Sequence, residues 1–222
     1  MSREQILENL ASTITAIRLP HPTRVAIDGI DAAGKTFLAE ELADHLVANG
    51  RKILRASLDS FHRPREFRYR LGYDSPEGYF HDSFDYDALL SLLLLPLGPG
   101  GSRRCRRRIY DIRTESPVQD EFIQVPADAI LLFDGVFLLR PELIDVWDFR
   151  IFLNVDFETS LQRALDRDLP VLGSVEAIKQ RYLERYIPGQ RLYLETVRPQ
   201  TLANVVVDNH HLSNPLIRVP KR

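Results

Sequence analysis

The sequence predicts an α/β fold in which a five-stranded parallel sheet is flanked by helices. The first observation is a set of five short, almost continuous apolar segments, most of them separated by helical segments. Strands that are buried on both faces have this composition, and parallel neighbours require crossover helices. The second observation is a glycine-rich segment directly after the first strand, at the sheet edge where such folds bind ligands. The predicted strands are Arg24–Asp28, Lys52–Leu58, Ala129–Phe133, Phe149–Val155 and Asn204–Val207.

The first predicted element is a helix over Ser2–Arg18. Ser2 and Gln5 have the spacing of a capping box, in which each side chain bonds the other residue's backbone N–H. Apolar residues recur at helical spacing on one face of this segment. These residues are Ile6, Leu10, Ile14 and Ile17. The second helix is expected over Lys35–Ala48, because Asn49 and Gly50 form a stop signal after it.

The segment from Phe61 to Val125 differs in composition from the rest of the chain. It is rich in charged, aromatic and turn residues, and its apolar residues show only weak periodicity. A helix near Tyr86–Leu95 ends at the breaker of Pro96–Gly101. Arg103–Ile112 and Val118–Val125 are expected to pair as an antiparallel hairpin across Thr114–Pro117. The whole segment is predicted to be an insertion at one rim of the sheet. Beyond it, helices are expected at Phe157–Asp168 and Ser174–Thr196.

Composition excludes several classes of protein. The chain has 222 residues, 44% hydrophobic and 27% charged, with a net charge of −2, so nothing global indicates a nucleic-acid or membrane partner. One cysteine, Cys105, excludes an internal disulfide and suits a reducing compartment. The first ten residues lack a signal-peptide core, and the longest apolar run, Ala88–Leu97, is too short to span a membrane. We expect a cytoplasmic protein, and a homo-oligomer stays open.

The segment GIDAAGKT, Gly29–Thr36, matches the phosphate-loop pattern G-x-x-x-x-G-K-[ST]. Glycines let the backbone curl so that successive N–H groups point at the phosphates. In this interpretation Lys35 reaches the β- and γ-phosphates and Thr36 places its hydroxyl on Mg²⁺. The alternative is a chance glycine turn, but the flanking strand and helix are the context that the motif requires. The cradle residues are Gly29, Asp31, Ala32, Ala33, Gly34, Lys35 and Thr36.

Two carboxylates follow predicted strands. Asp59 ends the second strand, where it could accept a proton from an attacking hydroxyl or orient Mg²⁺. Asp134 ends the segment AILLFD and resembles the acid that supports Mg²⁺ beside a phosphate loop. An ordinary turn aspartate is the alternative for both. The predicted metal ligands are Thr36, Asp59 and Asp134.

Arginines supply two further candidate sites. The run Arg103–Arg108 is either a patch that binds phosphate or nucleic acid or the solvated face of a hairpin. The second interpretation is favoured because the run is short, the chain is net acidic and aromatic interleaving is absent. Cys105 within it is expected to be inert. Arg163 and Arg167 lie one helical turn apart and are candidates for a lid over the transferring phosphoryl group. Spacing alone does not rank them against the further candidates Arg181, Arg185 and Arg191.

With these residues in place, the chain resembles the uridine kinase family of phosphate-loop kinases, which also includes phosphoribulokinase and pantothenate kinase. The resemblance runs from about Val25 to Asn209. The segment SLDSFH is similar to the family's strand-end D-x-F-Y, with Asp59, Phe61 and His62 at the matching positions. Four more segments are similar in order and spacing to family motifs. These are IYDIRTESP, LLFDGVFLL, ALDRD and ANVVVDN.

The resemblance implies a P-loop NTPase fold with a substrate hairpin and a mobile, arginine-bearing lid. It implies transfer of the γ-phosphate of ATP to a sugar hydroxyl, with Mg²⁺ as cofactor. Asp59 matches the general base, Tyr110 a residue lining the nucleoside pocket and Arg167 a lid arginine. A single domain over residues 1–222 is then expected, with residues 61–125 as the acceptor-binding insertion and residues 163–191 as the lid and following helix.

The departures from the family concern the acceptor. Glu115 stands where the nucleoside kinases have a pyrimidine-reading histidine. The aspartate that binds the ribose hydroxyls would fall near Phe80, where Asp82 or Asp85 could substitute. His62 replaces a tyrosine and Asp134 a glutamate, and the lid segment after Asp168 lacks R-G-R. The predicted acceptor-binding residues are Asp59, Phe61, His62, Tyr110 and Glu115.

These observations favour an ATP-dependent kinase of a small hydroxyl compound, with a nucleoside such as uridine or cytidine as the first candidate. The nearest alternative is a kinase of another metabolite, of the pantothenate or sugar type. A nucleoside-monophosphate kinase lacks its D-R-[YH] acceptor motif here. A non-catalytic nucleotide-binding regulator would have no need of Asp59 as a base, and a simple ATPase has no need of so large an insertion. The catalytic residues expected are Asp59, Lys35 and Arg167.

Overall fold

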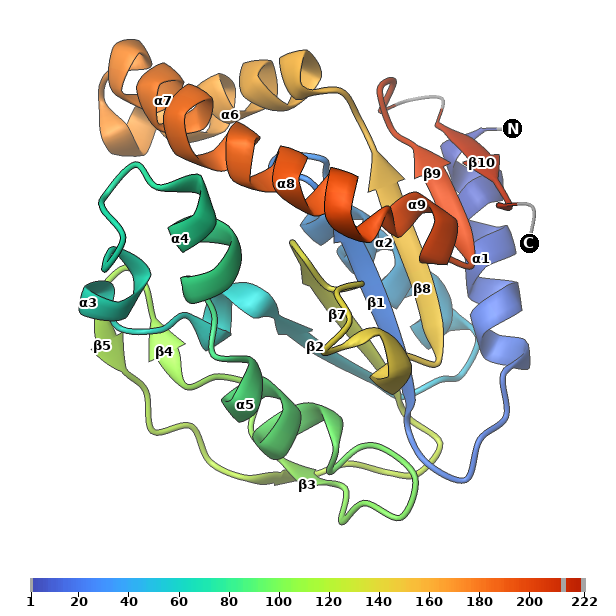
Figure 1. Cartoon of the computed structure of the whole chain (residues 1–222). Coiled ribbons are helices and arrows are strands. Elements are labelled where there is room, and N and C mark those ends of the chain that lie inside the picture. Colours follow the sequence, from blue (N-terminus) through green and yellow to red (C-terminus); the bar gives the residue numbers. More distant parts are fainter. Residues whose placement is uncertain (1, 213–214, 221–222) are drawn as a thin grey trace.

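The computed structural model describes residues 2–212 and 215–220 and contains the predicted central sheet (Figure 1). Its strand order is β10-β9-β8-β1-β7-β2, and the five predicted strands all run parallel. The sixth strand, β10, pairs antiparallel with β9 at the edge, so the prediction of five strands was one short. This strand has only three residues, none of them buried, and therefore carries no buried apolar run. The strand bounds are β1 Thr23–Gly29, β2 Ile53–Ser57, β7 Ile130–Gly135, β8 Phe149–Asn154, β9 Val205–Asp208 and β10 Leu216–Arg218.

Both faces of the sheet are buried, as near-continuous apolar strands predict. Successive residues of β1 enter different cores, with Ala26 on one face and Val25 and Ile27 on the other. Helices α1 (Arg3–Ala16) and α2 (Lys35–Ala48) cover the second face. The predicted capping box at Ser2 and Gln5 begins α1, and the predicted bounds of α2 are those observed.

The insertion between β2 and β7 contains short helices and two short ladders. In order it holds η1 Leu58–Phe61, α3 Arg65–Arg68, α4 Pro76–Asp82, α5 Tyr86–Leu89 and the π-helical turn η2 Leu90–Leu94. The predicted hairpin forms as two antiparallel pairs, β3 Arg104–Cys105 with β6 Ile123–Gln124, and β4 Tyr110–Asp111 with β5 Ser116–Pro117. Its turn lies at residues 112–115 rather than at Thr114–Pro117, because Ser116 and Pro117 pair with β4.

The chain after β8 first forms helices beyond the carboxyl ends of the strands and then returns across the first face of the sheet, where residues of its last two helices pack into the core (Figure 1). Its helical elements are α6 Phe157–Leu172, α7 Val175–Arg181, the π-helical turn η4 Tyr182–Tyr186, α8 Ile187–Val197 and α9 Pro199–Leu202. A short 3-10 turn, η3 Ile144–Val146, precedes β8. Figure 1 shows α6 and α7 beyond the ends of β1 and β8, and the insertion helix α4 packs against α8 and η4. The predicted helix Ser174–Thr196 is therefore one helical path interrupted by η4.

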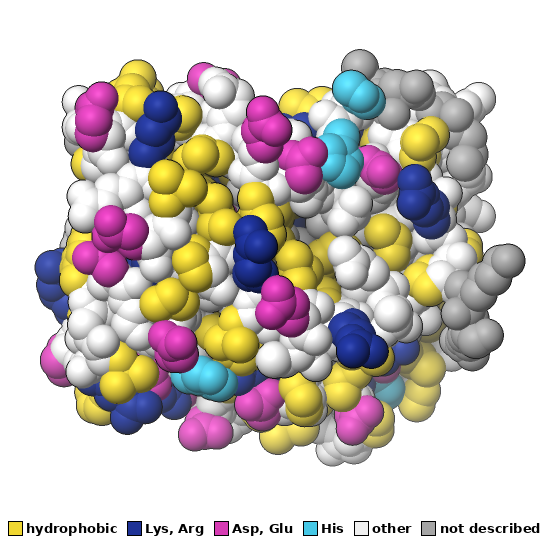
Figure 2. All heavy atoms as spheres, turned by 45° about the horizontal axis from the view of Figure 1, so that its top comes forward, with side chains coloured by type: hydrophobic (Ala, Val, Ile, Leu, Met, Phe, Trp, Pro, Cys, Tyr) yellow, Lys and Arg dark blue, Asp and Glu magenta, His cyan; other side chains and the backbone are white. Residues whose placement is uncertain are grey.

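Among the residues that the structure describes, no helix combines the length and hydrophobicity that crossing a membrane requires. On the face drawn in Figure 2, basic, acidic and hydrophobic side chains are interspersed, and no large patch of one charge forms there.

Candidate functional site

The phosphate-loop sequence folds into a tight turn between β1 and α2. Gly29 has φ of 155°, and a Cβ built on it would lie 2.7 Å from the Leu153 carbonyl oxygen of β8, so only glycine fits this approach. Gly34 is the N-cap of α2 and adopts φ of 95°, in the left-handed region that favours glycine. The start of α2 therefore presents backbone N–H groups to the loop, as anion binding at a helix N-terminus requires.

The two side chains expected at the phosphates and the metal lie beside this turn. Lys35 Nζ donates to the Ile30 carbonyl at 2.8 Å, within the loop itself. Thr36 Oγ1 donates to Asp134 Oδ2 at 2.9 Å, which joins the start of α2 to the end of β7. Hydroxyl and carboxylate oxygens are the ligand types that Mg²⁺ prefers, so this pair fits the ion. The sequence interpretation missed Arg55, whose Nη2 lies 3.0 Å from Asp134 Oδ1 and offsets its charge.

Asp59 lies in η1, directly after β2, and its side chain is exposed. Its pKa is raised, first by loss of hydration among the surrounding protein atoms and then by repulsion from Asp31 and Asp134, while His62 and Lys35 oppose the shift. Water screens part of this effect because the side chain is exposed. The same influences show that Asp59 shares one electrostatic environment with Lys35 and Asp134.

Of its two predicted neighbours, Phe61 is fully buried against Phe133 and supports η1 from the core. His62 is half-buried, with Nδ1 2.8 Å from the Asp59 carbonyl oxygen and its ring 4.6 Å from that of Phe84. Burial lowers the pKa of His62, although Asp59 partly opposes this. His62 is therefore placed beside the backbone of Asp59, while the position of Phe61 is that of a packing residue.

Tyr110 and Glu115 meet across the β4–β5 turn. The Tyr110 hydroxyl donates to Glu115 Oε2 at 3.1 Å, and the same oxygen accepts from Arg68 Nη2 of α3. Loss of hydration raises the pKa of Glu115, but the Arg68 ion pair and the Tyr110 hydrogen bond outweigh it and leave the pKa lowered. Glu115 is therefore ionised and paired. The sequence interpretation looked to residues 103–108 for a neutralising arginine, and the partner is Arg68 instead.

The run Arg103–Arg108 has the packing expected of a hairpin strand. Arg104 and Arg106 lie over the ring of Phe122, at 4.8 and 4.3 Å from its centre. Cys105 between them is buried, and burial raises the pKa of its thiol to about 11. A thiol that stays protonated is a weak nucleophile, in keeping with the prediction that it is inert.

The two candidate lid arginines, Arg163 and Arg167, make different contacts. Arg163 donates from Nη2 to the carbonyl oxygens of Asn209 at 2.8 Å and His210 at 3.1 Å, and so anchors α6. Arg167 is exposed and bonds Asp168 at 2.6 and 2.9 Å and the Tyr182 hydroxyl at 3.1 Å. Both the Asp168 bonds and the neighbouring carboxylates raise the pKa of Arg167.

The three candidate arginines of the following helices each contact different groups. Arg181 donates to the hydroxyls of Tyr69, Tyr73 and Tyr186. Arg185 is buried and donates to the carbonyl oxygens of Tyr73, Ser75 and Arg68, so it ties η4 to the insertion. Arg191 lies over the ring of Phe157. Of the five candidates, Arg167 combines an exposed guanidinium with electrostatic contact to the loop residue Asp31.

Two aspartates beside the loop, one buried and one half-buried, have partners that were missed from the sequence. Asp28, fully buried at the end of β1, accepts from Gly29 N at 2.8 Å and from the Tyr193 hydroxyl of α8. Burial raises the pKa of Asp28 to about 6, although these hydrogen bonds oppose the shift. Asp31 accepts from Tyr79 of α4 and Gln190 of α8, both at 2.8 Å. The sequence identified Asp31 as a residue of the phosphate loop, but it identified none of these partners.

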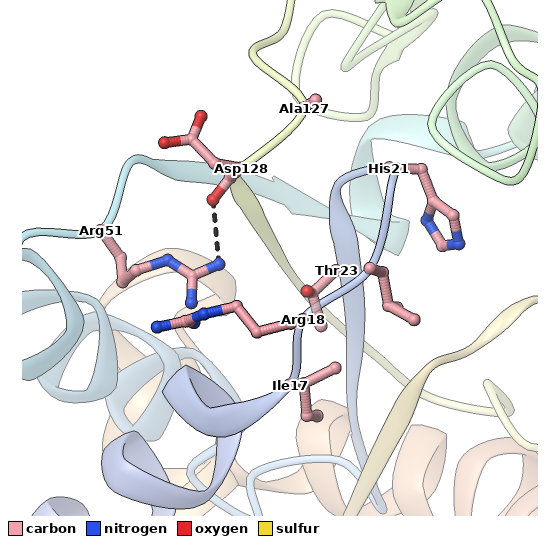
Figure 3. Close-up of a pocket in the computed structure, with 8 residues that line it drawn as sticks. Ile17, Arg18, His21, Thr23, Arg51, Ala127 and Asp128 are labelled. Carbon is pink, nitrogen blue, oxygen red and sulfur yellow. Dashed lines mark hydrogen bonds between the residues drawn. The ribbon is translucent and has the colours of Figure 1, made fainter.

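A hollow of about 260 Å³ lies at the opposite edge of the sheet (Figure 3). Its residues precede or begin β1, β2 and β7, whereas the candidate site residues follow these strands. Arg51 donates to the carbonyl oxygens of Thr15 at 3.1 Å and Asp128 at 2.9 Å, and the Asp128 carboxylate points away from it. The hollow contains none of the predicted site residues, so the chemistry places the candidate site at the phosphate loop.

The sequence model of the phosphoribulokinase / uridine kinase family matches residues 25–211. The chain belongs to this family. A uridine kinase from Leuconostoc citreum is 28% identical over 193 residues, which cover 84% of this chain and 87% of that protein. The family identifies the chain as an ATP-binding kinase, a phosphotransferase with a hydroxyl acceptor.

Solved structures agree with the fold. A protein described as a possible uridine kinase from Bacillus stearothermophilus has a TM-score of 0.73 at 24% identity, and the match covers 91% of this chain and 97% of that one. A D-glycerate 3-kinase from Cryptococcus neoformans has a TM-score of 0.58 at 16% identity, covering 85% of this chain and 87% of that one. Proteins named for different acceptors therefore share this fold.

Proposed function

We propose that this protein transfers the γ-phosphate of Mg·ATP to a hydroxyl group of a small neutral acceptor, with a nucleoside such as uridine as the first candidate. The observation that carries the proposal is the 2.9 Å hydrogen bond between Thr36 and Asp134. It brings two of the three expected Mg²⁺ ligands together at the loop. The third, Asp59, lies on the neighbouring strand end within their electrostatic reach.

Each residue has a separate role in this proposal. Bound Mg²⁺ would neutralise developing charge on the phosphates, held by Thr36 and Asp134. Asp59 would accept the proton of the attacking hydroxyl, and its raised pKa makes it a better base than an ordinary aspartate. Lys35 would exchange its bond to the Ile30 carbonyl for the phosphates, and Arg167 would exchange Asp168 for the transferring group.

An anionic acceptor is the second candidate, and one observation favours it. An isolated Glu115 would repel an acid, but Arg68 pairs with it and removes the net charge of the turn. The fold shared with a D-glycerate 3-kinase is compatible with such an acceptor. The hairpin contacts thus support an acceptor preference without fixing its charge.

A screen of ADP release tests the proposal. Wild-type protein with Mg·ATP is presented with nucleosides, sugars, glycerate and pantothenate, and a thermal shift with each compound reports binding separately. We expect one neutral polyhydroxyl compound to raise ADP release, and Lys35→Ala to abolish the increase. ADP release that no acceptor stimulates would refute the proposal, and stimulation by glycerate alone would favour the second candidate.

A further inference from the structure

Asp31 connects the phosphate loop to three helices, α4, α6 and α8. Its Oδ2 accepts from the Tyr79 hydroxyl of α4 and from Gln190 Nε2 of α8, both at 2.8 Å. Its backbone N–H donates to Gln190 Oε1 at 2.9 Å, and its carbonyl accepts from Ser160 Oγ of α6 at 2.7 Å. Four contacts from three helices hold this one loop residue, so the position of its carboxylate is fixed before any ligand binds.

The carboxylate keeps unused capacity to accept hydrogen bonds. Both of its side-chain bonds use Oδ2, and within residues 2–212 and 215–220 no donor bonds Oδ1 and no cation pairs with the group. A carboxylate has about four acceptor positions. Arg167 offsets the charge of Asp31 from a distance, but no cation in the described part of the chain forms an ion pair with it. A carboxylate charge beside a loop for polyphosphate is unfavourable, and an amide would accept from Tyr79 without that cost. A donor supplied by a ligand would explain the carboxylate.

The location points to the acceptor rather than to ATP. Asp31 is close enough to Asp59 to raise its pKa, and close enough to Arg167 to raise that pKa also. It therefore lies near both the expected base and the lid arginine. Tyr79, which holds it, belongs to the insertion that is expected to bind the acceptor.

The other carboxylates considered for the acceptor hydroxyls are already engaged. Asp82 is buried and forms two bonds with Arg70, at 2.8 and 2.7 Å. Asp85 is the N-cap of α5, where its side chain accepts from Ala88 N at 2.9 Å. Both oxygens of Asp82 are thus paired with Arg70, and the carboxylate of Asp85 is oriented toward the start of α5. Asp31 reaches the same insertion through Tyr79, which lies three residues before Asp82.

We propose that Asp31 recognises the acceptor by accepting a hydrogen bond from a second hydroxyl group, next to the one that is phosphorylated. Tyr79 and Gln190 act as positioning residues that hold Oδ2 and leave Oδ1 for the ligand. The acceptor is then a polyol, in which at least two hydroxyls lie close together. This inference rests on the proposed function and narrows its substrate class.

The test is designed as a double-mutant cycle, in which one change is made in the protein and the other removes a hydroxyl from the acceptor. Wild-type and Asp31→Asn proteins are assayed for kcat/KM with uridine, 2′-deoxyuridine and 3′-deoxyuridine, and Asp44→Asn, on an exposed carboxylate of α2, controls for lost charge. Asp31→Asn should lose about 10–100-fold with uridine, as expected for one hydrogen bond to a charged group, mainly through KM. With the deoxy compound lacking the recognised hydroxyl, the loss should be at most about twofold, because that bond is already absent.

Each outcome of this comparison either supports or overturns the role of Asp31 in acceptor recognition. An equal loss with all three compounds would overturn the inference and make Asp31 a structural residue, and so would no loss at all. Tyr79→Phe should lower kcat/KM for uridine more than for the deoxy compound if Tyr79 acts through Asp31. If the wild type prefers another polyol, that compound and its deoxy forms replace uridine. An acceptor with a single hydroxyl would overturn the inference and leave the kinase function standing, whereas no transfer to any hydroxyl compound would refute the proposed function itself.

Discussion

Asp28 makes a pH-dependent contribution to stability whose size follows from its burial. Its side chain is fully buried at the end of β1, and its pKa rises from 3.8 to about 6 in the folded protein. The folded state therefore holds a proton more tightly than the unfolded state does. The associated stabilisation is fully present below pH 3.8 and is lost as the pH rises to about 6. The difference of 6 − 3.8, about two units, corresponds to about 3 kcal/mol at 1.36 kcal/mol per unit.

The perturbation is Asp28→Asn, which removes the titration and keeps the shape. Asparagine can accept only one of the two bonds from Gly29 N and the Tyr193 hydroxyl, so a constant offset is expected. Tyr193 does not titrate in this range, because its pKa lies well above 10. The unfolding free energy of the variant minus that of the wild type should therefore rise by about 3 kcal/mol between pH 3.8 and 7 and then level off.

The assay is urea denaturation of both proteins at closely spaced pH values, with the slope of the transition held as a check on two-state behaviour. Asp208→Asn is the matched control. The bonds from His210 outweigh loss of hydration at Asp208 and lower its pKa, so removal of this carboxylate should cost stability above its ordinary pKa and not below. A difference for Asp28→Asn that is flat with pH, or that grows as the pH falls, would refute the burial argument.

Three further predictions concern the chemistry. Lys35→Ala should abolish acceptor-dependent ADP release and weaken ATP binding in a nucleotide titration; unchanged rate and affinity would exclude Gly29–Thr36 as the phosphate site. Asp59→Asn should lower kcat by at least ~10²-fold with a modest change in KM, the low end for general-base catalysis. A large rise in KM with kcat intact would make Asp59 a binding residue. Glu115→Gln, which removes the charge that pairs with Arg68, should change the ranking of acceptors in steady-state assays; a fixed ranking with altered ATP parameters would assign Glu115 to the nucleotide side.

The parts of the fold that local chemistry encodes were predicted well. The helix Lys35–Ala48 was predicted with its observed bounds, because the phosphate loop precedes it and the stop signal Asn49-Gly50 follows it. The five parallel strands were predicted because strands buried on both faces carry continuous apolar runs. The edge strand β10 was missed because its side chains are not buried and its pairing depends on β9 alone.

The candidate site was likewise predicted only in part from the sequence. The phosphate loop and the strand-end residues Asp59 and Asp134 were identified from the sequence, since the carboxyl ends of parallel strands meet at one edge. Their roles remain predictions. The hydrogen-bond partners of the other site residues were not identified from the sequence. Glu115 pairs with Arg68, which lies 47 residues away, and no spacing rule connects a turn in the hairpin to α3.

The sequence by itself determined the sheet, the phosphate loop and the chemistry expected there, because backbone conformation and burial are encoded by neighbouring residues. Only the tertiary structure decided which side chains meet. It tied Arg163 and Arg185 to backbone carbonyls, left Arg167 exposed near the loop, and joined Asp31 to Tyr79 and Gln190. Such contacts join elements up to 159 residues apart, and they form because packing of the helices over the sheet brings these side chains within hydrogen-bond distance.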